Sequence, residues 1–256
     1  MAALTLVIVN RNNSRWLEDC FSSVNSQTLA EFELLFVDDA STDDSIARFE
    51  QYSWRKGITP TLVRLPENVG VSKARITGMS RVVTDYVTNL DSDDFLISPN
   101  KLLRELQLAS EQPCTIAFSR IILVDTQGSP LPTQPRRPVH EGNLQLAMLN
   151  RSIMIPRDFV MPIELYQRAG GYDPELNLYE DWDLKIRLAS LSSFHYTGLD
   201  GIAYRKHNQG LSAVAMHRHL EAQARVIVKN LPLYANALTL EQLLAVLHDL
   251  KLTTKP

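Results

Sequence analysis

Residues 86–96 of the chain read YVTNLDSDDFL, and this stretch predicts the strand around which the fold is arranged. It begins with a run of apolar and β-branched residues of strand length, Tyr86–Leu90, which stops at the acidic segment Asp91–Asp94. Ser98 and Pro99 then supply an N-cap and a first-turn proline, which typically open a helix. The stretch therefore predicts a strand, an acidic turn and a helix in succession.

The same alternation runs through the whole first half of the chain. Three more apolar runs of strand length precede residue 86, and helical patterning follows them; these runs are Leu4–Val9, Glu33–Val37 and Thr61–Leu65. Strands that alternate with helices form βαβ units, in which a mainly parallel sheet is buried on both faces. We therefore predict an α/β fold with a Rossmann-like, mainly parallel sheet flanked by helices.

The second half is less regular. The proline-rich segment Ser129–Pro138 excludes a helix and indicates a loop. Around it, the pattern predicts strands over about 114–124 and 194–204, helices over about 144–149 and 179–191, and two amphipathic helices over about 213–230 and 239–250. The last two helices would form a C-terminal helical extension.

The composition is that of a soluble globular protein, with 45% hydrophobic and 21% charged residues among 256. The 26 basic and 29 acidic residues give a formal charge of -3, which argues against a nucleic-acid-binding surface. Cys20 and Cys114 lie far apart and show no metal-ligand spacing. The sequence contains neither a signal peptide nor an apolar run of roughly 18 residues, so we expect a cytoplasmic protein.

Polar residues follow three of the predicted strands. In an open parallel sheet, ligands bind beyond the carboxyl ends of the strands, and these ends carry residues 10–11, 38–39 and 91–94 here. Aspartates at strand ends also form turns and cap helices, and we interpret Asp43 and Asp44 in that way.

Asp91 and Asp93 are different, because Ser98 already begins the following helix and leaves them nothing to cap. Two carboxylates one residue apart can approach a hard cation together, since such a cation prefers oxygen ligands. A third acidic cluster, Glu180–Asp183, begins a predicted helix, where negative charge also favours the helix dipole. These clusters are the candidate sites.

Five segments together resemble the family 2 glycosyltransferases of the GT-A fold, inverting enzymes that use nucleotide-diphosphate sugars. They are 7–45 (VIVNRNNSRWLEDCFSSVNSQTLAEFELLFVDDASTDDS), 67–75 (ENVGVSKAR), 86–96 (YVTNLDSDDFL), 170–188 (GGYDPELNLYEDWDLKIRL) and 207–212 (HNQGLS). Their order and spacing match the family. The resemblance implies metal-assisted transfer of a sugar, most often from a UDP-linked donor, to a hydroxyl of a glycan or lipid-linked acceptor in bacterial cell-surface polysaccharide biosynthesis.

The resemblance also implies which residues bind the donor. Asp39 matches the carboxylate that hydrogen-bonds the base, usually uracil, and Arg11 lies where the loop after the first strand lines the base pocket. Asn68 and Lys73 fall where the family approaches the sugar and phosphates of the nucleotide. The chain departs from the family at Ile76, where asparagine is common, and this change removes a polar contact.

Asp91 and Asp93 match the DxD signature of the family. There the first aspartate faces the ribose or the metal, and the last ligates the divalent cation, Mn²⁺ or Mg²⁺, that bridges the phosphates. His207 matches a late histidine that completes the metal or phosphate site in some members, although a histidine after a strand is equally often structural. Such a cation neutralises the charge that develops on the leaving diphosphate.

Asp181 matches the catalytic base of the family, and Glu180 and Trp182 beside it are candidate acceptor-binding residues. The acceptor hydroxyl loses its proton as it attacks the anomeric carbon, so a carboxylate on the face opposite the leaving group serves as general base. Trp182 also has the helical phase of a buried residue, which is the competing interpretation.

The resemblance divides the chain into a glycosyltransferase domain, 1–212, and the helical extension, 213–256. Within the domain, residues 1–110 would form a nucleotide-binding half and residues 111–212 an acceptor-binding half. The extension, and the arginines of the proline-rich loop, are candidates for contact with an anionic acceptor or with the inner face of the cytoplasmic membrane. A solvated loop and a packed helix or dimer contact are the simpler interpretations, and the oligomeric state is open.

Three other functions fit part of the pattern. A haloacid-dehalogenase-like phosphatase also has a DxD at a strand end, but there the aspartates follow the first strand, whereas Asp91 follows the fourth. A sugar-nucleotide pyrophosphorylase has a glycine-rich loop after its first strand, and residues 10–13 contain no glycine. A GT-A-like domain that binds a nucleotide sugar or glycan without turnover stays open as the alternative.

Overall fold

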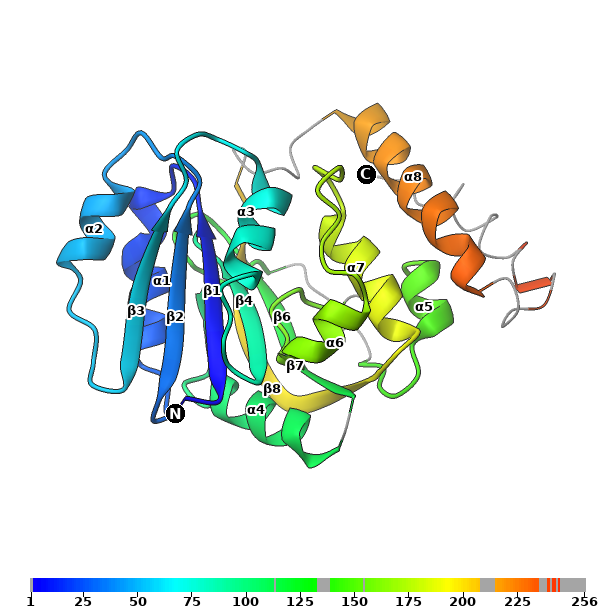
Figure 1. Cartoon of the computed structure of the whole chain (residues 1–256), viewed down its shortest axis with the longest axis horizontal. Helices are drawn as coiled ribbons and strands as arrows, with labels where there is room; N and C mark the ends of the chain where they lie inside the picture. The colour runs from blue at the N-terminus through cyan, green and yellow to red at the C-terminus, as the bar shows by residue number, and fades with distance from the viewer. Residues whose placement is uncertain are drawn as a thin grey trace.

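The computed structural model describes residues 2–112, 114–132, 139–153, 155–207 and 215–234, together with residues 239, 241, 242 and 244 (Figure 1). A five-stranded sheet lies at its centre, and helices cover both faces of this sheet. The prediction of an α/β fold with a mainly parallel sheet is confirmed.

The bounds of the strands in this central sheet are β1 (Leu4–Asn10), β2 (Phe32–Asp38), β3 (Ile58–Arg64), β4 (Tyr86–Asp91) and β7 (Met161–Pro162). Their order across the sheet is β3-β2-β1-β4-β7. The first four are parallel, and β7 pairs antiparallel with β4 at the edge. Since the parallel strands run in one direction, their carboxyl ends lie at the same edge of the sheet.

The side chains of β1 explain why both faces of the sheet are buried. Leu4 and Ile8 belong to the apolar core cluster that includes α1 (Leu17–Asn25), whereas Val7 belongs to the cluster that includes α3 (Val71–Met79). Successive residues of a strand point to opposite faces, so one continuous apolar run supplies both clusters.

A second sheet brings the end of the chain's longest strand to the acidic turn. Its strands are β5 (Phe95–Leu96), β6 (Thr115–Val124) and β8 (Ser193–Arg205), in the order β5-β8-β6. β8 pairs in parallel with β6 and antiparallel with β5, and Phe95 is opposite Ala203. Because β5 directly follows Asp94, this pairing places the residues after β8 next to the acidic turn.

The remaining helices connect or cover these sheets. They are a 3₁₀ turn η1 (Ser14–Trp16), α2 (Ser45–Gln51), α4 (Lys101–Glu111), α5 (Gln145–Leu149), α6 (Ile163–Arg168), α7 (Glu180–Ala189) and α8 (Met216–Tyr234). The helix predicted at Ser98 and Pro99 begins slightly later, at Lys101.

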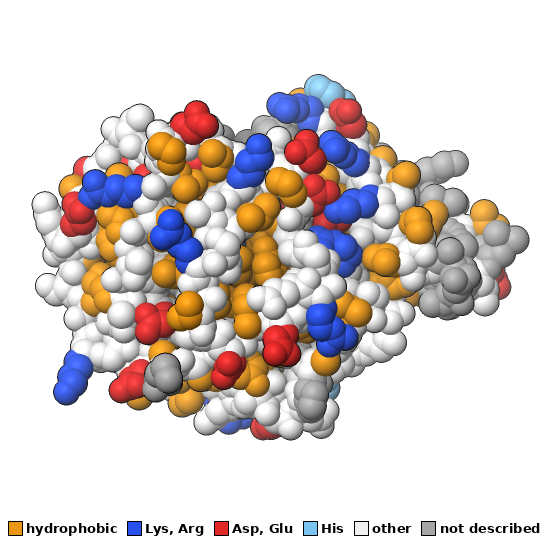
Figure 2. Space-filling view, viewed as in Figure 1, with side chains coloured by type: hydrophobic (Ala, Val, Ile, Leu, Met, Phe, Trp, Pro, Cys, Tyr) orange, Lys and Arg blue, Asp and Glu red, His pale blue; other side chains and the backbone are white. Residues whose placement is uncertain are grey.

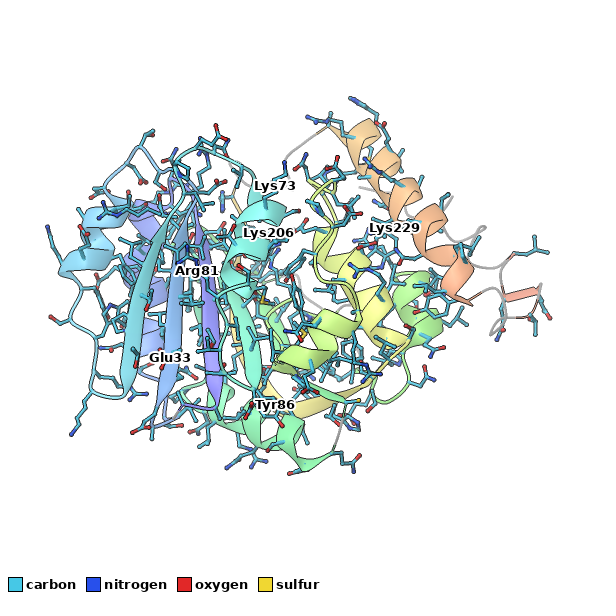
Figure 3. All side chains as sticks on the ribbon, viewed as in Figure 1. Glu33, Lys73, Arg81, Tyr86, Lys206 and Lys229 are labelled. Carbon is cyan, nitrogen blue, oxygen red and sulfur yellow. The ribbon has the colours of Figure 1, made fainter. Side chains whose placement is uncertain are left out.

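Helix α8 makes up most of the described part of the predicted C-terminal extension, and it packs against α7 (Figure 1). Val226 and Ile227 are buried, and Lys229 forms ion pairs with Asp173 at 2.7 Å and with Asp183 at 2.9 Å (Figure 3). Lys and Arg side chains, with Asp and Glu side chains among them, gather where α8 lies beside α7 (Figure 2). The packed-helix interpretation therefore holds for α8.

Three expectations about the second half lie mostly or wholly outside the described residues. The structure does not describe the arginines at 136 and 137 or the proposed domain boundary at 212. Of the helix predicted over 239–250, it describes only residues 239, 241, 242 and 244. Within the described ranges, no helix combines the length and the apolar character needed to cross a membrane.

Gly78 lets α3 lie close to the sheet, and this close approach gives a testable prediction. A Cβ atom at Gly78 would lie 2.5 Å from Cγ1 of Val7 and 3.1 Å from Cγ2 of Val37. We expect Gly78→Val to lower the free energy of unfolding by about 1–3 kcal/mol, the usual cost of overpacking a core. Urea denaturation measures the change.

Thr77→Val is the matched control, because it places the same side chain on the neighbouring, partly exposed position of α3. We expect it to change the free energy of unfolding by less than about 0.5 kcal/mol. Equal losses in the two variants would contradict the close-packing explanation.

Candidate functional site

A cavity of about 460 Å³ opens at the carboxyl ends of β1, β2 and β4, where the sequence places its polar residues. Most of the predicted site residues line it: Arg11, Asp39, Asn68, Asp91, Asp93, Glu180 and His207. The described lining does not include Lys73, Asp181 or Trp182. The fold therefore brings together residues from six separate parts of the sequence.

At one end of the cavity, Asp39 holds the loop that leads into α3. Its carboxylate accepts hydrogen bonds from the backbone N–H groups of Val69, at 2.7 Å, and Gly70, at 3.0 Å. Arg11 donates from Nη1 to the carbonyl oxygen of Asp39 at 2.6 Å. Asn68 lies exposed at the rim. This end of the cavity is thus ordered by backbone contacts, with polar groups facing inward.

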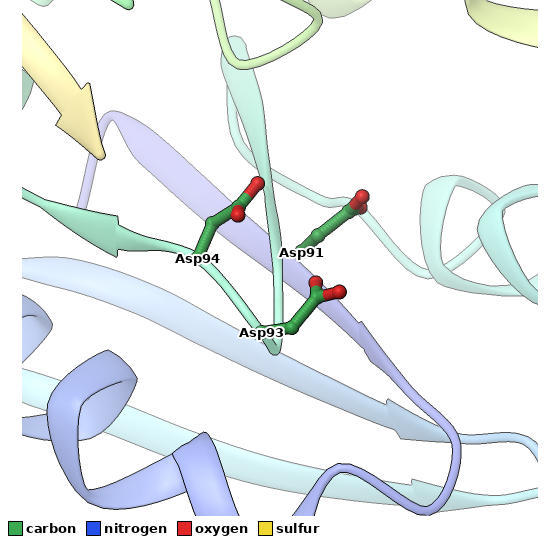
Figure 4. A group of neighbouring side chains, drawn as sticks. All are labelled: Asp91, Asp93 and Asp94. Carbon is green, nitrogen blue, oxygen red and sulfur yellow. The ribbon is translucent and has the colours of Figure 1, made fainter. Parts of the chain in front are cut away.

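The acidic turn after β4 forms the middle of the cavity. Carboxylate oxygens of Asp91, Asp93 and Asp94 all lie within 4.8 Å of one another (Figure 4). Asp93 contacts Nε2 of His207 at 2.8 Å through Oδ2, and Asp94 accepts the backbone N–H of Arg205 at 2.8 Å through Oδ1. Each of the three carboxylates therefore has a different environment.

Two of these carboxyl groups have pKa values shifted in opposite directions. Burial raises the pKa of Asp91, but the guanidinium groups of Arg157, at 2.9 Å, and Arg75, at 2.7 Å, outweigh it and lower the pKa overall. Burial, followed by the nearby carboxylate of Asp93, raises the pKa of Asp94 well above its usual value. Asp91 is therefore held ionised, while Asp94 favours its protonated form.

The donor atoms of this turn fit a divalent cation of the hard type. Three carboxyl groups converge, and Oδ2 of buried Asp94 has no hydrogen-bond partner among the described residues. Oxygen ligands of this kind suit Mg²⁺ or Mn²⁺. A bound cation would also favour the ionised form of Asp94, because an adjacent positive charge lowers a carboxyl pKa. Asp93 and Asp94 are the residues best placed to hold it.

The end of β8 supports the acidic turn from the other side. Arg205 donates from Nε to the carbonyl oxygen of Asp93 at 2.9 Å and from Nη2 to Asp19 at 2.7 Å. The ring of His207 lies on that of Trp16, with ring centroids 4.3 Å apart. His207 is thus held by a tilted ring contact with Trp16 and by its contact with Asp93, which orients Nε2 toward the acidic turn.

The first residues of α7 form the far end of the cavity. Tyr179 precedes this helix in the left-handed conformation, with φ of 63°. Glu180 faces the cavity and pairs with Arg75, whereas Asp181 pairs with Nζ of Lys185 at 2.8 Å. Burial raises the pKa of Asp181, but the positive charges of Lys185 and Arg157 outweigh it and lower the pKa overall. Asp181 is therefore ionised at neutral pH.

Besides Asp181, two predicted site residues lie outside the cavity lining. Lys73 is exposed on α3 (Figure 3). Trp182 is 5% exposed, belongs to the apolar core and donates from Nε1 to the carbonyl oxygen of Met148 at 2.6 Å. Its indole ring therefore has little free surface for stacking on a sugar, and Trp182 is a buried residue of the core, as its helical phase indicated.

Three arginines at the site do not appear among the residues predicted from the sequence: Arg75, Arg157 and Arg205. Arg75 could have been recognised, because it shares the inward side of a helix with Ala74, Gly78 and Met79, a place where a charge needs buried partners. No pattern near Arg157 signals its position, since it precedes the two-residue strand β7.

Comparison with known proteins identifies related sequences. The sequence model of the family described as "Glycosyl transferase family 2" matches residues 5–169. The glycosyltransferase TuaG of Bacillus subtilis (strain 168), named for teichuronic acid biosynthesis, is 34% identical over 132 residues, which are 50% of this chain and 50% of that protein. The amylovoran biosynthesis glycosyltransferase AmsE of Erwinia amylovora is 24% identical over 198 residues, 75% of this chain and 70% of that protein. The match thus spans about half the length of TuaG.

Solved structures share the fold. TarS 1-349 of S. aureus in complex with UDP-GlcNAc superposes with a TM-score of 0.69 at 16% identity, covering 100% of this chain and 82% of that one. The same protein in complex with UDP superposes with a TM-score of 0.66 at 15% identity, covering 98% of this chain and 80% of that one. GalNAc-T7 with UDP, GalNAc and Mn²⁺ gives 0.64 at 16% identity, covering 88% and 47%. The likeness confirms the GT-A fold.

The buried position of Arg75 leads to a stability prediction. Its side chain is 1% exposed and pairs with Asp91 and Glu180, so Arg75→Met would leave the buried carboxylate of Glu180 and the partly buried carboxylate of Asp91 with less compensation. We expect a loss of about 3–5 kcal/mol in the free energy of unfolding at pH 7. The loss should shrink as the pH falls, because protonation of Glu180 removes the uncompensated charge. Urea denaturation at several pH values measures it.

Arg48→Met is the control, because Arg48 and its partner Asp44 are 46% and 55% exposed. An exposed pair of this kind contributes about 0–1 kcal/mol. A loss at Arg75 no larger than the loss at Arg48 would contradict the role given to the buried ion pairs.

Proposed function

Because this chain belongs to glycosyltransferase family 2, we propose that its cavity binds a nucleotide-diphosphate sugar, UDP-linked, and transfers the sugar to a hydroxyl of a glycan or lipid-linked acceptor. One observation carries the proposal. A single cavity of about 460 Å³ joins Asp39, the Asp91–Asp94 turn and Glu180, which matches the succession of base, diphosphate and sugar in such a donor.

The orientation of the donor follows from the chemistry along the cavity. The end formed by Arg11, Asp39 and Asn68 offers one basic, one acidic and one neutral hydrogen-bonding side chain, and such a mixed set of donors and acceptors suits a nucleobase and ribose. The acidic turn suits the diphosphate only when a cation is present, since carboxylates otherwise repel phosphates. The complexes of TarS with UDP and UDP-GlcNAc support UDP as the nucleotide.

A divalent cation held by Asp93 and Asp94, with His207 beside Asp93, would neutralise the charge of the diphosphate as it leaves. GalNAc-T7, which has the same fold, was solved with UDP, GalNAc and Mn²⁺, in keeping with this assignment. Asp91 would act differently, because both of its oxygens pair with arginines. Its role would be to orient Arg75 and Arg157 beside the donor.

Asp181 is the proposed general base. The acceptor oxygen forms a bond to the anomeric carbon, the bond from that carbon to the diphosphate breaks, and the hydroxyl proton passes to Asp181. One direct displacement inverts the anomeric configuration. The low pKa of Asp181 keeps it ionised and able to accept this proton, and its side chain remains 23% exposed for an acceptor to approach. Glu180, at the cavity wall, would contact the acceptor or the sugar.

The biological setting is inferred from the named relatives. TuaG and AmsE are named for teichuronic acid and amylovoran biosynthesis, so a role in a bacterial cell-surface polysaccharide fits this chain. Contact with the inner face of the cytoplasmic membrane stays a prediction. A haloacid-dehalogenase-like phosphatase is excluded by the family match and by the position of Asp91 on the fourth strand. Binding of a nucleotide sugar without turnover is the remaining alternative.

Donor binding can be tested by thermal melting of the protein with UDP, GDP, CDP and dTDP, each with and without Mn²⁺. A ligand at about 100 times its Kd adds roughly 2.7 kcal/mol, which corresponds to a shift of about 5–10 °C for a chain of this size. We expect the shift with UDP and Mn²⁺ only. Asp93→Ala should abolish it, whereas the exposed control Asp44→Ala should preserve it. An unchanged shift in Asp93→Ala would refute the metal role.

Asp181→Asn separates catalysis from binding. We expect this variant to keep the UDP affinity of the wild type while kcat falls by about 10²- to 10⁴-fold, the usual contribution of a positioned base. Radiolabelled sugar transfer measures kcat, and calorimetry measures the affinity. Wild-type turnover in Asp181→Asn would remove Asp181 as the base, and no turnover in either protein would favour the binding-only alternative.

A further inference from the structure

Arg157 extends into the middle of the cavity from the segment that precedes β7. Its Nη2 lies 2.9 Å from Oδ2 of Asp91 and 3.8 Å from Oδ2 of Asp94. Its guanidinium carbon lies 5.5 Å from the centroid of the Tyr204 ring. The side chain is 19% exposed, and because it lines the cavity, that exposed part is accessible to a ligand.

Most of the hydrogen-bonding capacity of Arg157 is unused by the protein. Among the described residues, only Nη2 approaches an acceptor, and Nε and Nη1 have no hydrogen-bond partner. Arg205, which lines the same cavity, differs because its three nitrogens donate to Asp93, Thr126 and Asp19. Nε and Nη1 of Arg157 are not among the buried unpartnered atoms of the described residues, and Arg157 lines the cavity, so these donors are open to a ligand that enters it.

The position of Arg157 determines which part of a ligand it meets. The base end of the cavity is formed by Arg11, Asp39 and Asn68, and Arg157 belongs instead to the group around Asp91. Asp91 keeps Arg157 in place through one nitrogen, which leaves the other edge of the guanidinium fork open. A planar fork with two parallel N–H donors matches the two oxygens of a phosphate or a carboxylate.

We infer that Arg157 binds an oxyanion of the sugar nucleotide beyond its first phosphate: the β-phosphate or a carboxylate on the transferred sugar. This inference rests on the proposed function, because it needs a sugar-nucleotide donor in the cavity. It adds a fixed positive charge to the donor site that does not depend on the cation. Arg157 would thereby select diphosphates over monophosphates, or acidic sugars over neutral ones.

The test measures the affinity of Arg157→Gln for UMP, UDP, UDP-glucose and UDP-glucuronate by isothermal titration calorimetry with Mn²⁺ present. Loss of a charge-assisted hydrogen bond should weaken binding about ten- to a hundredfold. If the β-phosphate is the ligand, all three diphosphates lose affinity and UMP changes by less than about twofold. If a sugar carboxylate is the ligand, only UDP-glucuronate loses affinity. Either result supports the inference.

The control variant is Arg120→Gln, because Arg120 has a similar exposure of 25% and forms an ion pair with Asp200 outside the cavity. We expect it to bind all four ligands as the wild type does. Arg157→Lys keeps a positive charge beside Asp91 but lacks the planar guanidinium fork. We expect this variant to fold and to bind the same ligands with an affinity at least about threefold lower than that of the wild type.

Two results would overturn the inference: affinities of Arg157→Gln and Arg157→Lys within about twofold of the wild type for all four ligands, or a loss for UMP as large as that for UDP. Failure of the wild type to bind any uridine nucleotide would instead refute the proposed function itself. The two failures are therefore distinguishable, because the first leaves wild-type UDP binding intact.

Discussion

The side chain of Arg75 is buried where three parts of the chain meet, and its guanidinium pairs with Asp91 at the end of β4 and with Glu180 at the start of α7. Arg75 itself lies on α3, which Gly78 allows to pack closely on the sheet. One side chain therefore joins the acidic turn in the middle of the cavity to the end where transfer is proposed. Without this cation, Asp91 and Glu180 would be buried with less compensation, at considerable cost.

The alternation of charge around Arg75 explains how so many acidic groups can share one cavity. Asp91 is held ionised by two arginines, and Asp181 is held ionised chiefly by Lys185, whereas burial favours the protonated form of Asp94. Positive and negative charges in the cavity are thus close to balanced before a ligand enters, and a diphosphate adds negative charge. A divalent cation on the acidic turn, together with Arg157, is the charge that a donor would require.

The sequence predicted the parallel sheet, the acidic edge and the start of α7, because apolar runs and acidic clusters are local patterns. It did not predict β5 and β7, which have two residues each and are too short to carry a periodic signal, and it did not predict α6. Sequence spacing also could not indicate that Trp182 is held in the core by a contact with Met148, or that Arg157 reaches Asp91. Those contacts join residues 34 and 66 positions apart, and only the tertiary fold determines them.

We propose above all that the Asp91–Asp94 turn holds a cation against the diphosphate of a nucleotide whose base lies near Asp39. A crystal of the protein grown with UDP and Mn²⁺, with data collected at the manganese absorption edge, tests this most directly. We expect an anomalous peak within about 2.2 Å of a carboxylate oxygen of Asp93, and the uracil ring at the Arg11–Asp39 end of the cavity. A manganese peak away from the acidic turn, or UDP bound in the reverse direction, would contradict it.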